Sequence, residues 1–142
     1  MLKEPTNEEN EIAKQVVDSS FQIHKTFGPG LLENVYEVCL ADEMRFRGFS
    51  VETQKSIPLV FNNRKIETAF RADIVVNDKV LIELKSIEKI GKLQEAQILT
   101  YMKLSGLNLG LLINFNVPLI KEGIRRFYVS NNDERAFVAL AS

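Results

Sequence analysis

The chain has 142 residues, of which 45% are hydrophobic and 26% are charged, and its formal net charge at pH 7 is −1. This size and composition predict a single globular domain over residues 1–142, large enough to fold around its own hydrophobic core. Proteins that hold nucleic acid tightly by charge alone normally carry a basic excess, so the net charge counts against that class. A nuclease stays compatible with it, because acidic metal ligands lower the net charge and a local basic patch can bind phosphates.

Cysteine content and hydropathy favour a cytoplasmic protein that makes no contact with membranes. Cys39 is the only cysteine, so no intramolecular disulfide can form, which fits a reducing compartment. No apolar run approaches the roughly 18 residues that a membrane-spanning helix needs. The N-terminal segment also lacks the apolar stretch of a signal peptide.

Two helices are predicted at the start of the chain. Thr6 and Glu9 form a capping-box pattern, and the helix that follows is expected to end at Gly28-Pro29-Gly30. A second helix is predicted over residues 31–46, with Gly48 marking its end. The apolar stripes facing the core are expected to be Ile12, Val16, Ile23 and Phe27 in the first helix and Leu32, Val35, Cys39 and Phe46 in the second.

The middle of the chain is rich in strand-forming residues. Asn62-Asn63 is a hairpin turn candidate, and Asn77-Asp78-Lys79 is a second one. The predicted elements are strands at 57–61, 65–70, 71–76 and 80–85, a helix over 91–104, strands at 109–113 and 124–129, and a peripheral tail, 131–142, with a short helix. This order, α-α-β-β-β-β-α-β-β, predicts an α/β fold in which helices flank a mixed β-sheet.

Asp73, Glu83 and Lys85 are charged residues inside otherwise apolar strands. Such residues are costly to bury unless they are paired or hold a metal ion. Glu83 and Lys85 are two residues apart in a strand, so their side chains share a face.

The length of the loop at 77–79 decides whether the two acids can meet. A two-residue turn would pair Asp73 with Ile82 and turn Glu83 to the other face. A three-residue loop pairs Val76 with Val80 and sets Asp73 opposite Glu83. A metal site at this hairpin therefore requires an odd loop or a bulge.

If the carboxylates of Asp73 and Glu83 converge, they suit Mg²⁺ or Mn²⁺, which prefer oxygen ligands. The backbone carbonyl of Leu84 lies between the catalytic side chains and is a natural further ligand. Such an ion lowers the pKa of a bound water, and Lys85 could orient that water or neutralise a phosphate. Taken alone, the same residues are more often a solvated sheet face or a cross-strand salt bridge.

Two further motifs accompany Asp73 and Glu83-Leu84-Lys85, namely Gly30-Leu31-Leu32-Glu33-Asn34-Val35-Tyr36 and Gln97-Ile98-Leu99-Thr100-Tyr101. With them, the chain closely resembles the GxxExxY protein family, which is placed in the PD-(D/E)XK nuclease superfamily. The resemblance covers roughly residues 10–130 and implies a restriction-endonuclease-like core. Ala72 stands where the superfamily's name has proline.

The resemblance also implies roles for individual residues. Asp73 and Glu83 correspond to metal ligands and Lys85 to the catalytic lysine. Glu33 resembles the acid that the first core helix of the superfamily projects toward the metal. Gln97 and Tyr101 resemble a Q-x-x-x-Y element that lies near the site, and they share a helix face because they are four residues apart.

The remaining candidates have alternative interpretations. Arg71, Lys89 and Lys92 lie near the site in sequence and could contact nucleic-acid phosphates, although each is also compatible with a solvated charge. Tyr36 and Tyr101 could stack on a base, and hydrogen bonding to Glu33 or Gln97 is an equally good interpretation.

Two functions are compatible with these observations. The first is a Mg²⁺- or Mn²⁺-dependent nuclease acting on DNA, or alternatively on RNA. The second is a catalytically silent nuclease fold used for binding or scaffolding. A homodimer or a helicase-type partner is compatible with either.

Overall fold

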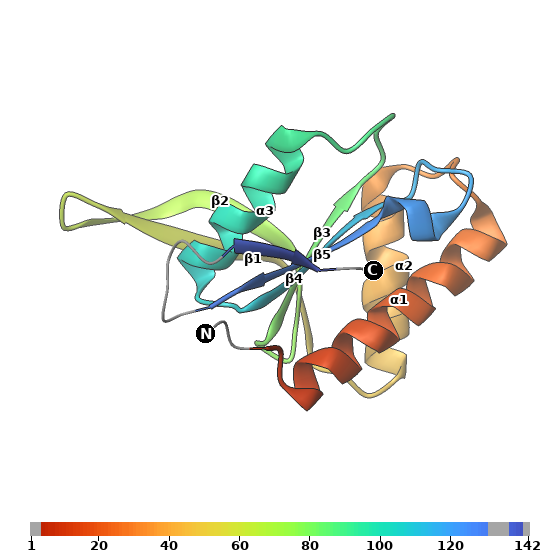
Figure 1. The fold of residues 1–142 in the computed structure, drawn as a ribbon, viewed down its shortest axis with the longest axis horizontal. Coiled ribbons are helices and arrows are strands. Elements are labelled where there is room, and N and C mark those ends of the chain that lie inside the picture. The colour runs from red at the N-terminus through yellow and green to blue at the C-terminus, as the bar shows by residue number, and fades with distance from the viewer. Residues whose placement is uncertain (1–3, 131–136, 141–142) are drawn as a thin grey trace.

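A six-stranded mixed sheet forms the centre of the protein, with helices on both of its faces (Figure 1). The structure is a computed structural model and describes residues 4–130 and 137–140. The helices are α1 (Asn7–Phe27), α2 (Glu33–Phe46), α3 (Lys92–Ser105) and a 3-10 helix (Ile120–Gly123), and the strands are β1 (Val51–Phe61), β2 (Arg64–Val76), β3 (Val80–Lys85), β4 (Leu109–Asn114), β5 (Ile124–Val129) and β6 (Phe137–Leu140). This arrangement confirms the predicted α/β class with a mixed sheet flanked by helices.

The strands follow one another across the sheet in chain order. All neighbours are antiparallel except β3 and β4, which are parallel and are joined through α3. α1 and α2 cover one face of the sheet and α3 covers the other (Figure 1). The two faces therefore have separate cores, which we call the α1–α2 core and the α3 core.

α1 begins and ends where the sequence predicts. The Thr6 N–H donates to Glu9 Oε1 at 2.8 Å, and the Glu9 N–H donates to Thr6 Oγ1 at 3.1 Å, which completes the capping box. Gly28 ends the helix with a φ of 67°, a conformation that suits glycine. Ile12, Val16 and Ile23 are buried as expected, whereas Phe27 is exposed.

The predicted core face of α2 is wrong. Leu32 and Phe46 are 72% and 86% exposed, and Cys39 is only half-buried. The buried stripe consists instead of Tyr36, Leu40 and Met44, which recur every four residues and point into the α1–α2 core. The scattered apolar residues of the other face obscured this stripe in the sequence.

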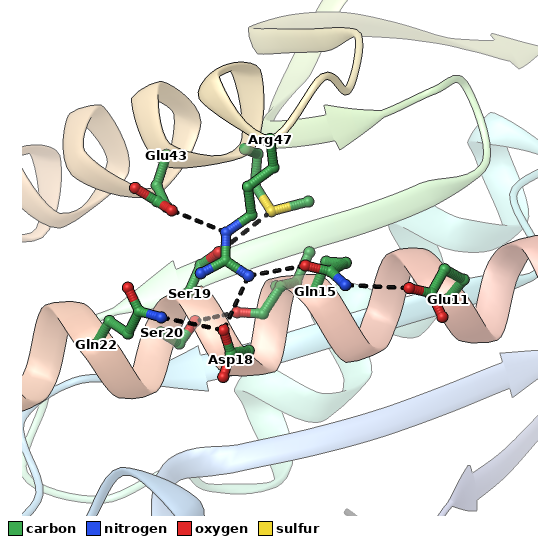
Figure 2. A network of polar contacts seen from close by, with 10 residues as sticks. Glu11, Gln15, Asp18, Ser19, Ser20, Gln22, Glu43 and Arg47 are labelled. Atoms are coloured by element: carbon green, nitrogen blue, oxygen red, sulfur yellow. Dashed lines mark hydrogen bonds and ion pairs between the residues drawn. The ribbon is translucent and has the colours of Figure 1, made fainter.

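Arg47, just after α2, ties that helix to α1, as Figure 2 shows. Its guanidinium donates to Glu43 at 2.8 Å, to Asp18 at 2.9 Å and to Gln15 at 2.8 Å. The planar fork of arginine can reach three acceptors at once, which lysine could not do in the same geometry. This network fixes the end of α2 that is remote from Glu33.

β1 and β2 form a long hairpin whose outer end projects beyond the helices (Figure 1). Asn62 and Asn63 make its two-residue turn with φ values of 50° and 60°, which confirms the predicted turn. The prediction of two separate strands at 65–70 and 71–76 is wrong, because β2 runs through both without a break.

α3 packs closely on β4, whose residues are all buried. A Cβ atom on Gly110 would lie 2.5 Å from Met102 Sδ, so glycine is needed where the helix crosses the strand. The helix predicted in the tail is wrong for residues 137–140, which form β6 beside β5. The rest of that tail, 131–136 and 141–142, lies outside the described residues.

Candidate active site

The loop between β2 and β3 has the three residues that a joint site of Asp73 and Glu83 requires. Val76 pairs with Val80 and Ile74 with Ile82, which confirms the predicted register. Asn77 and Asp78 both have a φ of 52°, in the left-handed region that Asn and Asp tolerate better than most residues. The two acidic side chains are therefore brought together at the end of the hairpin.

Asp73 and Glu83 are linked by hydrogen bonds between side chains and backbone. The Asp73 N–H donates to Glu83 Oε1 at 3.2 Å, and the Leu84 N–H donates to Asp73 Oδ2 at 2.8 Å. The pairing of β2 with β3 extends only from Val76 to Ile74, so these bonds satisfy backbone donors beyond the end of the ladder. They also fix the orientation of both carboxyl groups.

Glu83 is only 5% exposed, and its environment disfavours a negative charge. Burial, followed by the nearby Asp73 carboxylate, raises the pKa of Glu83 to about 8. Hydrogen bonding from Asp73 and the charge of Lys85 offset this only in part. Near neutral pH the pair therefore favours binding a proton, or a cation in its place.

Lys85 ends β3, two residues after Glu83, and is half-buried. Its positive charge acts to lower the pKa of both Glu33 and Glu83, so it lies within electrostatic reach of both acids. None of the ion pairs among residues 4–130 and 137–140 involves Lys85. Its ammonium group can therefore serve an anionic ligand beside the acids.

Glu33 is the first residue of α2 and faces the same group of charges. Burial raises the pKa of Glu33, the nearby Lys85 lowers it, and the charge of Asp73 raises it again. The backbone of Ser86 also lowers the pKa of Glu33. The charges of Asp73 and Lys85 thus both act on Glu33, and its role as a metal ligand stays a prediction.

Tyr36 supports the turn that leads into Glu33. Its hydroxyl donates to the Gly28 carbonyl and accepts a hydrogen bond from the Leu31 N–H at 3.0 Å. Its ring is fully buried and stacks on Phe115, with centroids 4.2 Å apart. The interpretation that Tyr36 stacks on a base is therefore wrong, as is hydrogen bonding to Glu33 or Gln97.

Gln97 and Tyr101 lie on α3, on the same side of the helix. Tyr101 stacks on Phe70 with ring centroids 3.9 Å apart. Burial raises the pKa of Tyr101, and the charges of Glu83 and Asp73 raise it further, so both carboxylates act electrostatically on its hydroxyl. Gln97 is half-buried, and its side chain forms no hydrogen bond within the described part of the chain.

Sequence reasoning missed Glu37 and Gln54. The Gln54 side-chain amide donates to Glu37 Oε1 at 2.6 Å and to Asp73 Oδ1 at 3.3 Å. Glu37 follows Glu33 by four residues, so the shared helix face was a signal that could have revealed it. Nothing in the sequence identifies Gln54, because its place opposite Asp73 depends on the register of β1 with β2.

Three basic residues lie close to the site residues along the chain. Arg71 in β2, Lys89 in the loop after β3 and Lys92 at the start of α3 are all exposed. Their positions are compatible with contacts to phosphates and equally with solvated charges, so nucleic-acid binding by them stays a prediction.

The donors present suit a hard divalent cation. Asp73 and Glu83 offer carboxylate oxygens next to a lysine, and the raised pKa of Glu83 shows that the pair lacks a compensating charge. Among the residues that the structure describes, no three His, Cys, Asp or Glu side chains are close enough to form a complete metal-binding group. A pair of protein carboxylates is nonetheless the donor set typical of Mg²⁺, which keeps several of its waters.

Comparison with protein-family models identifies the superfamily to which the chain belongs. Residues 10–127 match the model of the PD-(D/E)XK nuclease superfamily, and this span contains every residue of the site. The chain therefore belongs to that superfamily, and its mixed sheet with flanking helices is a restriction-endonuclease-like fold. Searches of curated proteins and of solved structures gave no significant match. In the described residues, no helix is long and apolar enough to cross a membrane.

Proposed function

We propose that this protein is a divalent-metal-dependent nuclease that hydrolyses phosphodiester bonds of DNA. The observation that carries the proposal is the hydrogen-bonded pair of half-buried Asp73 and buried Glu83, in which the pKa of Glu83 is raised to about 8 beside Lys85. Perturbed acids next to a cation are typical of functional sites. Membership of a nuclease superfamily indicates phosphodiester chemistry and a nucleic-acid ligand.

Asp73 and Glu83 are the residues that would hold Mg²⁺ or Mn²⁺, with the Leu84 carbonyl and Glu33 as further donors. Such an ion supplies a bound water of lowered pKa and stabilises the charge that develops on the phosphate. The hydrogen bonds at Asp73 keep its carboxylate fixed before the ligand arrives.

Lys85 would contact the scissile phosphate or the attacking water as a compact positive charge. Its position two residues after Glu83 on the same strand keeps it beside the acids, whatever substrate is bound. Tyr101, on whose hydroxyl both carboxylates act electrostatically, is a further group that could donate a hydrogen bond to the substrate.

The substrate and the partners of the protein form a second part of the proposal. The proposed ligand of Arg71, Lys89 and Lys92, which are exposed and lie near the site along the chain, is the phosphate backbone of DNA, with RNA as the alternative. Assignment to the GxxExxY family, cytoplasmic location and assembly as a homodimer or with a helicase-type partner belong to the same proposal.

One observation favours the alternative of a silent nuclease fold that serves as a binding or scaffolding module. Both oxygens of Asp73 already accept hydrogen bonds from the protein, and no group of three metal-ligating side chains exists among the described residues. A protein that needs no ion could keep such a pair permanently satisfied.

The test is cleavage of single- and double-stranded DNA in Mg²⁺ and in Mn²⁺, with Asp73→Ala and Lys85→Ala proteins purified in parallel. The proposal predicts metal-dependent cleavage that falls by at least about 100-fold in both variants, as for loss of groups that act in the transition state. Cleavage that persists in both variants would point to a contaminating nuclease. Absence of cleavage by the unaltered protein would favour the binding module.

A further inference from the structure

Gln54 has an unusual backbone conformation directly opposite Asp73. Thr53 pairs with Ile74 and Lys55 with Ala72, so the register sets Gln54 across from Asp73. The φ of Gln54 is 50°, in the left-handed region that is disfavoured for a residue with a Cβ atom. Residues held in such conformations cluster at functional sites, where the surrounding structure offsets the strain.

The neighbouring strand is irregular at the same level. Ala72 packs in the α3 core, whereas Ile74 and Val76 pack in the α1–α2 core. In a regular strand these three residues would face the same way, so the alternation of β2 is broken at Asp73. The irregularity turns the side chain of Asp73 toward both Leu84 and Gln54.

The amide of Gln54 connects Asp73 to a further acid on α2. Its Nε2 atom donates to Asp73 Oδ1 at 3.3 Å and to Glu37 Oε1 at 2.6 Å. With the Leu84 N–H on Oδ2, each oxygen of Asp73 accepts one hydrogen bond and keeps a lone pair for another partner. Burial raises the pKa of Glu37, and the bond from Gln54 opposes that effect.

We propose that Glu37 and Gln54 are positioning residues that orient Asp73 for cation binding, with Glu37 acting through the Gln54 amide. The proposal rests on the function proposed above, in which Asp73 is a metal ligand. Groups that hold a ligating carboxylate typically change metal affinity or activity by about 10–100-fold when removed. An amide that served only to join two surface elements would not need a strained backbone.

Four variants separate this role from a purely structural one. Gln54→Gly removes the amide and tolerates a φ of 50° without strain. Glu37→Ala removes the acceptor behind the amide, whereas Glu37→Gln keeps an oxygen acceptor there. Gln22→Ala is the matched control, since its exposed amide also donates to a carboxylate, that of Asp18, at 3.2 Å (Figure 2).

The first readout is Mn²⁺ binding to the whole protein by calorimetry, together with the melting temperature. Gln54→Gly is expected to bind Mn²⁺ about 10–100-fold more weakly without a lower melting temperature, because the backbone strain is relieved. Glu37→Ala should follow Gln54→Gly, Glu37→Gln should recover most of the affinity, and Gln22→Ala should match the unaltered protein. Equal affinity in Gln54→Gly and the unaltered protein would overturn the proposal.

The second readout needs no metal and separates the two proposals. It is hydrogen exchange of the Leu84 amide, which donates to Asp73 Oδ2. If Gln54 holds Asp73, exchange at Leu84 is faster in Gln54→Gly and Glu37→Ala than in Gln22→Ala. Unchanged exchange overturns the positioning role. Faster exchange in a protein that binds no Mn²⁺ supports positioning while contradicting the metal-dependent function.

Discussion

Glu83 is the residue at which stability and function conflict most clearly. It is a carboxyl group whose pKa rises from an ordinary value of 4.5 to about 8 in the fold. A raised acid pKa means that the folded state keeps its proton where the unfolded state has lost it. The stability from this group is therefore fully present below about pH 4.5 and is lost as the pH rises to about 8.

Glu83→Gln is accordingly expected to stabilise the metal-free protein at pH 8 while abolishing cation binding. In the unaltered protein the loss amounts to about 1.4 kcal/mol for each pH unit between the two pKa values. Urea unfolding in EDTA at pH 5, 6.5 and 8 measures the difference. The gain from Glu83→Gln should grow with pH, and a gain that is the same at all three values would contradict the raised pKa.

A second prediction concerns the hydroxyl group of Tyr36. Tyr36→Phe keeps the stacked ring but leaves the Leu31 N–H and the Gly28 carbonyl without the hydroxyl between them. The expected cost is about 1–3 kcal/mol of unfolding free energy, together with a lower affinity for the cation, because the turn before Glu33 loosens.

Tyr128→Phe is a suitable control for this substitution. Tyr128 is also buried, and its hydroxyl has no hydrogen bond within the described part of the chain. Chemical denaturation should show a smaller effect than for Tyr36→Phe. Equal losses in the two variants would mean that the hydroxyl of Tyr36 does not hold the turn.

Some residues of the site could be predicted from the sequence and others could not. Asp73, Glu83 and Lys85 could be found because period-two alternation and loop length are local properties of the chain. Gln54 could not, because its partners Glu37 and Asp73 are 17 and 19 residues away and meet it only through the long hairpin and its packing on α2. Its left-handed backbone is likewise a tertiary effect.

Among the elements, local signals predicted the helix ends and turns well, but not the start of β1, which lies at Val51 instead of Ile57, the unbroken course of β2 or the buried face of α2. The capping box at Thr6, the turn at Asn62-Asn63 and the loop at 77–79 were all correct because each depends on a few adjacent residues. The face of α2 was wrong, because exposed Leu32 and Phe46 are as apolar as its true core residues. Exposed apolar residues are common on protein surfaces, so the sequence of a helix alone does not show which of its apolar residues are buried.

The crossing of α3 and β4 gives a prediction for α3, which carries Tyr101, and for β4, which pairs with the strand of Glu83. Gly110→Ala would place a Cβ atom 2.5 Å from Met102 Sδ and 3.3 Å from Ile98 Cδ1. We expect a loss of about 1–3 kcal/mol in the unfolding free energy, as for other overpacked cores.

A double-mutant cycle with Met102→Ala checks the cause of that loss. Removing the Met102 side chain makes room for the new methyl group, so Gly110→Ala should cost less in the Met102→Ala protein than alone. Thermal or urea denaturation of the three variants measures the coupling. Strictly additive losses would contradict the clash with Met102 as the cause.

At the scale of the whole molecule, the net charge of −1 hides a local imbalance. The charge of Asp73 acts on Glu33, Glu37 and Glu83, and Lys85 is the cation that acts on Glu33 and Glu83. A bound divalent cation would convert this acidic centre into one that tolerates a phosphate.

Cation binding should therefore stabilise the entire fold. A ligand that binds only the folded state raises stability by mass action, about 2.7 kcal/mol at 100 times its dissociation constant. Melting curves at pH 8 should move to higher temperature with Mn²⁺ and return with EDTA. The shift should be absent in Asp73→Asn, and an equal shift in that variant would mean that Mn²⁺ binds elsewhere.

The most direct measurement is Mn²⁺ binding by calorimetry at pH 6.5 in two buffers with different ionisation enthalpies, which counts the protons released. Because the pKa of Glu83 is about 8, Glu83 is protonated at this pH and must lose its proton to bind the ion. We predict that binding releases about one proton per ion, and that Asp73→Asn neither binds the ion nor releases a proton. No binding by the unaltered protein, or binding without proton release, would contradict the assignment of Asp73 and Glu83 as the metal site.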